Sequence, residues 1–182
     1  MKVVNGSRDR ALAFRADAGM GLPSRPYVVI GLIDPDQSPP LLEPDSWRRD
    51  ALYLRCMDLD NERIAEQFPQ LRPHLFTREH AERIATFVKT LSKDIEGIFV
   101  HCEAGVSRSA GVAAALDEYF QNDASRWFQR LRPNPLVYHR MQDALSRKEH
   151  DLTRFPCAVC SRWVRWLAAL GFRRLALWVG ER

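Results

Sequence analysis

The apolar positions of the chain fall into short continuous runs that predict buried strands. Tyr27–Ile33 (YVVIGLI) and Ala51–Met57 (ALYLRCM) have strand length, and Ile98–Val100 is a shorter apolar run that follows Gly97. Continuous apolar runs of this kind are typical of strands that are buried on both faces of a sheet. Residues 1–24 show no clear period, and we interpret them as a loose arm or a first short strand.

Helical patterns separate and follow these runs. The clearest helix is expected from Thr77 to about Ser92, because the Thr77 hydroxyl can cap the first turn and apolar residues then recur on one face at helical spacing. The alanine-rich segment Ser109–Tyr119 predicts a buried helix. Two further helices are expected, a short one capped by Asp123 and another over Leu136–Arg147.

This alternation predicts an α/β domain with a central, mostly parallel sheet flanked by helices. A length of 182 residues fits one domain plus an extension. We expect the arm or first strand at 1–24, the main domain at 25–150 and a helical, amphipathic extension at 151–182. We interpret the extension as a helix packed on the domain or on a partner, with an anionic membrane surface as the alternative. It contains Trp163, Trp166, Phe172 and Trp178 among Arg162, Arg165, Arg173 and Arg174.

Composition narrows the function classes. The chain is 46% hydrophobic and 27% charged, with a net charge of +4, which is the balance of a globular domain with a core. A mild basic excess suits an anionic ligand, but no run of lysine and arginine is dense enough for a nucleic-acid surface. The sequence shows neither a signal-peptide pattern nor an apolar run long enough to span a membrane, so a cytoplasmic location is expected.

The cysteines are therefore expected to be thiols. Cys157 and Cys160 have the spacing of half a zinc site, but the chain has no second matched pair. We expect no bound metal and no cofactor. Cys56 is interpreted as a core residue. The alternative is that it approaches Cys102 and traps the oxidised sulfur of that residue as a disulfide.

The most informative segment runs from His101 to Ser109 and lies between a predicted strand and a predicted helix. A loop at a helix N-terminus presents backbone N–H groups and positive potential to an anion. Gly105 allows tight curvature, and the planar fork of Arg108 can bind two phosphate oxygens at once. The segment thus predicts a phosphate-binding loop. Its binding residues are Glu103, Ala104, Gly105, Val106, Ser107 and Arg108.

The same field favours a thiolate at Cys102. Helix N-termini and cationic neighbours lower the pKa of a cysteine from about 8.5 to roughly 3.5–7.5. Cys102 is therefore the expected nucleophile. The Ser109 hydroxyl can donate to its sulfur and help the thiolate leave in a later step. His101 is expected to orient the loop through its ring nitrogens.

The segment resembles the HCxxGxxR(S/T) signature of the protein tyrosine phosphatase superfamily. Its Ser107-Arg108-Ser109 ending is similar to the dual-specificity branch and to compact bacterial phosphatases. The resemblance covers about residues 27–147 and implies the cysteine-phosphatase fold, a phosphocysteine intermediate and phosphorylated protein as the substrate class. The acidic Glu103 within the loop disfavours polyanionic inositol phosphates.

The resemblance also implies a general acid on a separate upstream loop. Asp58 and Asp60 follow the predicted strand Ala51–Met57. Asp58 is favoured because it comes directly after the strand, and Asp60 is the alternative; either can instead cap the next helical turn. The competing functions are an inactive phosphate-binding module and a thiolate-based sulfurtransferase or arsenate reductase.

Overall fold

A parallel sheet organises the part of the chain that the computed structural model describes, which is residues 1–14, 22 and 25–147. The strands there are β1 (Lys2–Gly6), β2 (Tyr27–Ile33), β3 (Arg48–Arg55) and β4 (Gly97–His101), in the spatial order β1-β4-β2-β3. All three neighbouring pairs are parallel. The predicted α/β class is confirmed, and of the two interpretations of the first residues the strand is correct.

The central strands β2 and β4 are buried along their whole length. Alternate residues of β2 enter two separate apolar clusters, with Val28, Ile30 and Leu32 on one face and Tyr27 and Val29 on the other. This two-sided burial explains why both strands show as continuous apolar runs in the sequence.

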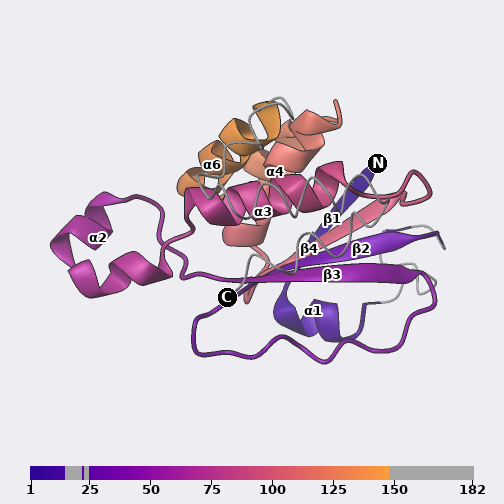
Figure 1. Cartoon of the computed structure of the whole chain (residues 1–182), viewed down its shortest axis with the longest axis horizontal. Coiled ribbons are helices and arrows are strands. Elements are labelled where there is room, and N and C mark those ends of the chain that lie inside the picture. The colour runs from indigo at the N-terminus through magenta and orange to yellow at the C-terminus, as the bar shows by residue number, and fades with distance from the viewer. Residues whose placement is uncertain (15–21, 23–24, 148–182) are drawn as a thin grey trace, which may run out of the picture. The chain divides into compact units, whose positions relative to one another are not determined.

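Helices cover both faces of the sheet. Figure 1 shows α1 (Arg8–Leu12) on one side and α3 (Arg78–Lys89), α4 (Arg108–Tyr119) and α6 (Pro135–Ser146) on the other. The apolar residues of α3, α4 and α6 share one cluster with the sheet. The short helix α5 (Ser125–Arg130) joins α4 to α6 along the chain. The arrangement places the N-terminus of α4 at the end of β4.

Of the two predicted helix caps, the one at Thr77 is confirmed and the one at Asp123 lies one residue too early. Thr77 caps α3 as predicted: its hydroxyl accepts from the His80 N–H at 3.2 Å, and His80 Nδ1 accepts from the Thr77 N–H at 3.1 Å. At α5, Ala124 occupies the capping position, and the Asp123 carboxylate accepts from the Ser125 N–H at 2.9 Å. The helix therefore begins one residue later than an Asp123 cap requires.

Residues 58–74 leave the sheet after β3 and return before α3; we call them the excursion. They contain α2 (Arg63–Gln67) and the 3₁₀ helix η2 (Pro69–His74), of which only η2 had no counterpart in the sequence pattern. The Met57 N–H donates to the His74 carbonyl at 2.7 Å, which closes the neck of the excursion. Arg140 of α6 contacts Glu62 and the Phe76 carbonyl. Figure 1 shows α2 set apart from the sheet.

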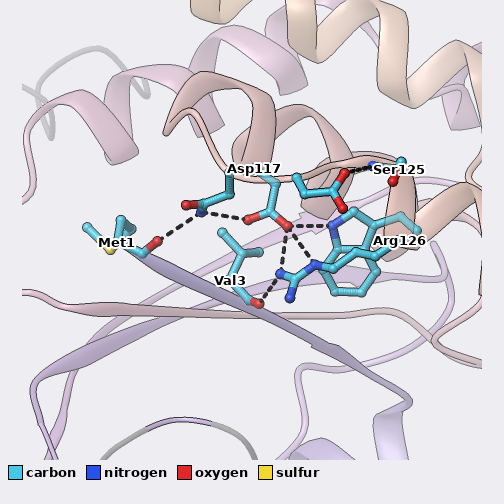
Figure 2. Close-up of polar contacts among 8 residues, drawn as sticks. Met1, Val3, Asp117, Ser125 and Arg126 are labelled. Carbon is cyan, nitrogen blue, oxygen red and sulfur yellow. Dashed lines mark hydrogen bonds and ion pairs between the residues drawn. The ribbon is translucent and has the colours of Figure 1, made fainter.

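A buried carboxylate ties the N-terminal strand to the helices (Figure 2). Asp117 of α4 is fully buried, and its Oδ2 accepts from Arg126 Nη2 at 2.6 Å. The same Arg126 nitrogen donates to the Val3 carbonyl at 3.0 Å. Asn122 donates to Asp117 Oδ1 at 2.9 Å and to the Met1 carbonyl at 3.1 Å. The network compensates the carboxylate for its lost hydration.

The predictions on the C-terminal extension lie outside the described residues, as do those on Cys157 and Cys160. The compact unit described above spans Met1–Ser146. None of the described helices combines the length and the apolar character that a membrane crossing requires.

Candidate active site

The predicted residues Cys102 and Asp58 lie at the carboxyl edge of the sheet, together with Asp34, which was not predicted. Cys102 follows β4, Asp34 follows β2, and Asp58 stands three residues after β3. Parallel α/β sheets bind their ligands at this edge, where the loops after neighbouring strands meet. The sheet order thus brings together side chains that are far apart in the sequence.

The Cys102 thiol lies inside the loop that connects β4 to α4. The residue is 2% exposed, its Sγ lies 3.0 Å from the Ser109 hydroxyl, and the Gly105 N–H donates to the same sulfur at 3.3 Å. The loop ends where α4 begins, at Arg108. A thiolate here receives two donors and faces the positive end of a helix. The chemical environment that a nucleophilic thiolate needs is therefore present.

Strand β1 and the first residue of α1 hold the back of the loop between β4 and α4. The Arg8 N–H donates to the Glu103 carbonyl at 3.0 Å, and Asn5 Nδ2 donates to the Gly105 carbonyl at 2.7 Å. In a trans peptide the C=O and the following N–H point in opposite directions. Because Asn5 binds the Gly105 carbonyl, the N–H of Val106 points away from β1, where an anion can accept from it.

Gly105 meets two conditions that a side chain would violate. Its φ is +73°, in the left-handed region. A Cβ at this position would lie 2.5 Å from the Gly6 carbonyl carbon and 2.6 Å from the Ser7 nitrogen. The loop packs directly on the backbone of β1, and only glycine fits.

Arg108 is buried at the end of the loop and forms an ion pair with the partly exposed Asp34. Its Nη1 donates to the Cys56 carbonyl at 2.5 Å and lies 2.7 Å from Asp34 Oδ1. The side chain of Arg108 is 4% exposed and that of Asp34 30%. Among the described residues no group accepts from Arg108 Nε, which is also buried. Nη1 is therefore anchored, and Nε is a buried donor without an acceptor among the described residues.

Asp58 contacts the phosphate-binding loop itself. Its Oδ1 accepts from the Ser107 hydroxyl at 2.7 Å and from Asn134 Nδ2 at 2.8 Å. Asp60 is exposed, and its carboxylate accepts from Asn61 Nδ2 at 2.9 Å. Of the two aspartates, Asp58 is the one with a hydrogen bond to the loop in the described structure.

His101 is fully buried and packs through its ring. The ring centroid lies 5.9 Å from that of Tyr53 and 6.1 Å from that of Phe99. Neither ring nitrogen has a hydrogen-bond partner within the described residues, so the expected orientation of the loop through these nitrogens is not seen there. Burial, together with the charge of Arg8, lowers the pKa of His101 to about 4. The imidazole is neutral near pH 7 and supports the loop by packing.

Cys56 matches the core interpretation. It is fully buried, and desolvation raises the pKa of its thiol to about 12. Cys56 follows β3 and Cys102 follows β4, and β2 lies between these strands. Two strand spacings give a Cα separation of about 10 Å, beyond the roughly 7 Å limit for a disulfide. A Cys56–Cys102 disulfide would require the strands to move.

Three residues of the site were missed from the sequence: Asn5, Asp34 and Asn134. Asp34 directly follows a predicted strand, which is the signal that singled out Asp58. Asn134 stands between two prolines ahead of a predicted helix, a pattern typical of a helix cap. Asn5 carries no local signal, because its partner is 100 positions away.

Among the comparisons with known proteins, only the search of solved structures found similar chains. No protein-family model matches the chain, and no curated protein matches it. The human tyrosine phosphatase-like serine/threonine/tyrosine-interacting protein is similar at 20% identity and a TM-score of 0.41, over 78% of this chain and 89% of that one. The Cydia pomonella PTP-2 phosphatase is similar at 22% identity and a TM-score of 0.38, over 79% of this chain and 85% of that one.

Proposed function

We propose that the chain is a phosphomonoester hydrolase of the protein tyrosine or dual-specificity phosphatase type, acting through a phosphocysteine intermediate. One observation carries the proposal: the Cys102 sulfur lies inside an anion-binding loop whose Ser107 hydroxyl is hydrogen-bonded to Asp58. The acid, which comes from a separate segment after β3, is thus held next to the loop that carries the nucleophile. An inert core thiol has no need of either neighbour.

In the first step the Cys102 thiolate attacks phosphorus in line with the leaving oxygen. A sulfur–phosphorus bond forms and the ester P–O bond breaks. The leaving oxygen takes the proton of the Asp58 carboxyl group. The N–H groups of the loop and Arg108 stabilise the charge on the remaining oxygens.

In the second step water attacks the phosphocysteine. Asp58, now a carboxylate, accepts a proton from this water as the new P–O bond forms. The sulfur–phosphorus bond breaks, and the returning thiolate is stabilised by the Ser109 hydroxyl at 3.0 Å. Inorganic phosphate leaves, and the starting protonation state is restored.

Phosphorylated protein side chains are the proposed substrates. The rim of the loop is not strongly basic, because Glu103 and Ala104 are exposed beside Val106, which is 40% exposed. A carboxylate at this rim repels additional phosphates on the same ligand. A single phosphate carried on a peptide fits this rim better than a polyphosphorylated small molecule.

The test compares hydrolysis of p-nitrophenyl phosphate and phenyl phosphate by wild type, Cys102→Ser, Asp58→Asn and Asp60→Asn. We expect Cys102→Ser to be inactive. We expect Asp58→Asn to lose about 10²- to 10⁴-fold in kcat on phenyl phosphate, whose poor leaving group needs a proton. Asp60→Asn, the matched control, is expected to remain close to wild type.

Acid quenching during turnover should trap phosphate on Cys102. Phosphate binding without turnover by wild type would overturn the proposal in favour of a phosphate-binding module. Turnover of thiosulfate or arsenate without turnover of phosphoesters would favour a sulfurtransferase or an arsenate reductase.

A further inference from the structure

Asn134 lies where the start of the excursion, at Asp58 and Leu59, meets the phosphate-binding loop and α6. The residue is 2% exposed. Its Nδ2 donates to Asp58 Oδ1 at 2.8 Å and to the Leu59 carbonyl at 3.1 Å. Its backbone N–H donates to the Ser107 carbonyl at 3.1 Å. One buried residue therefore joins the acid to the loop, with its side chain on the acid and its backbone on the loop.

Asn134 also caps α6. Its Oδ1 accepts from the Val137 N–H at 3.1 Å, and Pro135 occupies the first helical position. This is the usual capping geometry for asparagine. The capping bond uses the oxygen of the amide, whereas the contact with Asp58 uses its nitrogen. The two roles can thus be separated by substitution.

The contact determines which oxygen of Asp58 can carry a transferable proton. Oδ1 accepts from two donors, Asn134 Nδ2 and the Ser107 hydroxyl. An oxygen occupied by two donors is a poor position for a proton, so the proton of the carboxylic acid lies on Oδ2. The same bonds hold the carboxyl group at a fixed distance from the loop.

We infer that Asn134 is a positioning residue for general acid catalysis, which holds Asp58 against the phosphate-binding loop and leaves Oδ2 to protonate the leaving group. The inference rests on the proposed phosphatase function. It concerns the acid alone, because within the described residues Asn134 makes no hydrogen bond to Cys102 or Arg108 and contacts Ser107 through its backbone. Oxyanion binding should therefore depend little on the Asn134 amide.

The informative variant is Asn134→Ser. A serine hydroxyl can accept from Val137 and keep the helix cap, but it is too short to reach Asp58. We expect a lower melting temperature, because the Leu59 carbonyl loses its donor, but an affinity for inorganic phosphate near that of the wild type. We expect kcat on phenyl phosphate to fall between about 10- and 10²-fold, as for a misplaced catalytic group, while kcat on p-nitrophenyl phosphate changes little.

Asn122→Ala is the matched control. Asn122 also donates to a carboxylate and a backbone carbonyl, those of Asp117 and Met1 (Figure 2). Its loss should lower stability without making kcat depend on the leaving group. A double substitution completes the test: in an Asp58→Asn background, Asn134→Ser should have almost no further effect, because the group that it positions is gone.

Each outcome decides the question. An equal loss on both substrates, or an undiminished loss in the Asp58→Asn background, would overturn the role of Asn134 while leaving the phosphatase function in place. Absence of wild-type turnover would overturn the proposed function, and the inference would fall with it. If Asn134→Ser does not fold, Asn134→Thr provides the same comparison, since it also keeps a capping hydroxyl oxygen and removes the amide donor to Asp58.

Discussion

The side-chain amide of Asn5 donates a hydrogen bond to the Gly105 carbonyl across 2.7 Å, although the two residues are 100 positions apart. The bond turns the carbonyl away from the region where we propose that an anion binds. Replacing Asn5 with alanine leaves that buried carbonyl without its donor, which costs about 1–3 kcal/mol. We expect Asn5→Ala to bind phosphate more weakly and to unfold more readily. Calorimetric titration and urea unfolding measure both effects, and an unchanged phosphate affinity would contradict this role.

Asp34 provides the counter-charge of Arg108 when no anion is bound. Its carboxylate lies 2.7 Å from Arg108 Nη1. Asp34→Asn keeps the shape and removes the charge, so the folded protein should become less stable by about 1–3 kcal/mol. A bound anion can restore the missing charge, and ligand binding to the folded state raises stability. We therefore expect phosphate to raise the melting temperature more in Asp34→Asn than in wild type. An equal increase in both proteins would argue against this exchange of counter-charges.

His101 makes stability depend on pH. Burial lowers its pKa from 6.5 to about 4. Between these values the unfolded chain binds a proton that the folded chain does not. The contribution of His101 to the free energy of unfolding is therefore complete above about pH 6.5 and is lost as the pH falls toward 4. A pKa difference of 2.5 corresponds to about 3 kcal/mol.

The measurement is the free energy of unfolding in urea between pH 4.5 and 7.5, for wild type and His101→Phe, at spacings of about one pH unit. The wild type should lose stability more steeply on acidification than the variant. The pKa of His80 is also lowered by burial, but His80 is present in both proteins, so their difference isolates His101. Parallel curves would show that the imidazole does not titrate as described.

The two described thiols should differ in reactivity. Desolvation raises the pKa of Cys56 to about 12, so it remains a neutral thiol at pH 7. Cys102 accepts from the Gly105 N–H inside a loop that attracts anions. We expect iodoacetate to modify Cys102 in the native protein and Cys56 only after unfolding, with phosphate protecting Cys102. Peptide mass spectrometry identifies the modified residue, and comparable modification of Cys56 in the native protein would contradict the assignment.

The sequence predicted the parts of the fold that depend on local periodicity. β2 was predicted at its observed bounds, and the cap of α3 at Thr77 is as expected. The edge strand β3 was predicted at 51–57 and lies at Arg48–Arg55. Its bounds are determined by pairing with β2, where Arg48 lies opposite Tyr27. Such a register depends on the neighbouring strand, so the sequence of β3 alone did not locate it.

The candidate site divides in the same way. The loop from His101 to Ser109 is contiguous, so its residue types and spacing could be interpreted directly. Asn5 and Asn134 act through partners 100 and 76 positions away, respectively. Nothing in the local sequence of an asparagine indicates such a partner, and only the sheet order brings the pairs together.

The excursion is a suitable place to insert a foreign peptide segment, because a hydrogen bond joins its two ends. Because Met57 and His74 are bonded at the base, the chain returns to where it left, and the bond does not depend on what lies between. Doubling the length of a flexible loop costs only about 0.6 kcal/mol. Phe68, half-exposed between α2 and η2, marks a place where a reporter peptide or a recognition segment can be inserted. Recognition of new partners can therefore be engineered, or can evolve, without redesign of the chemistry at Cys102.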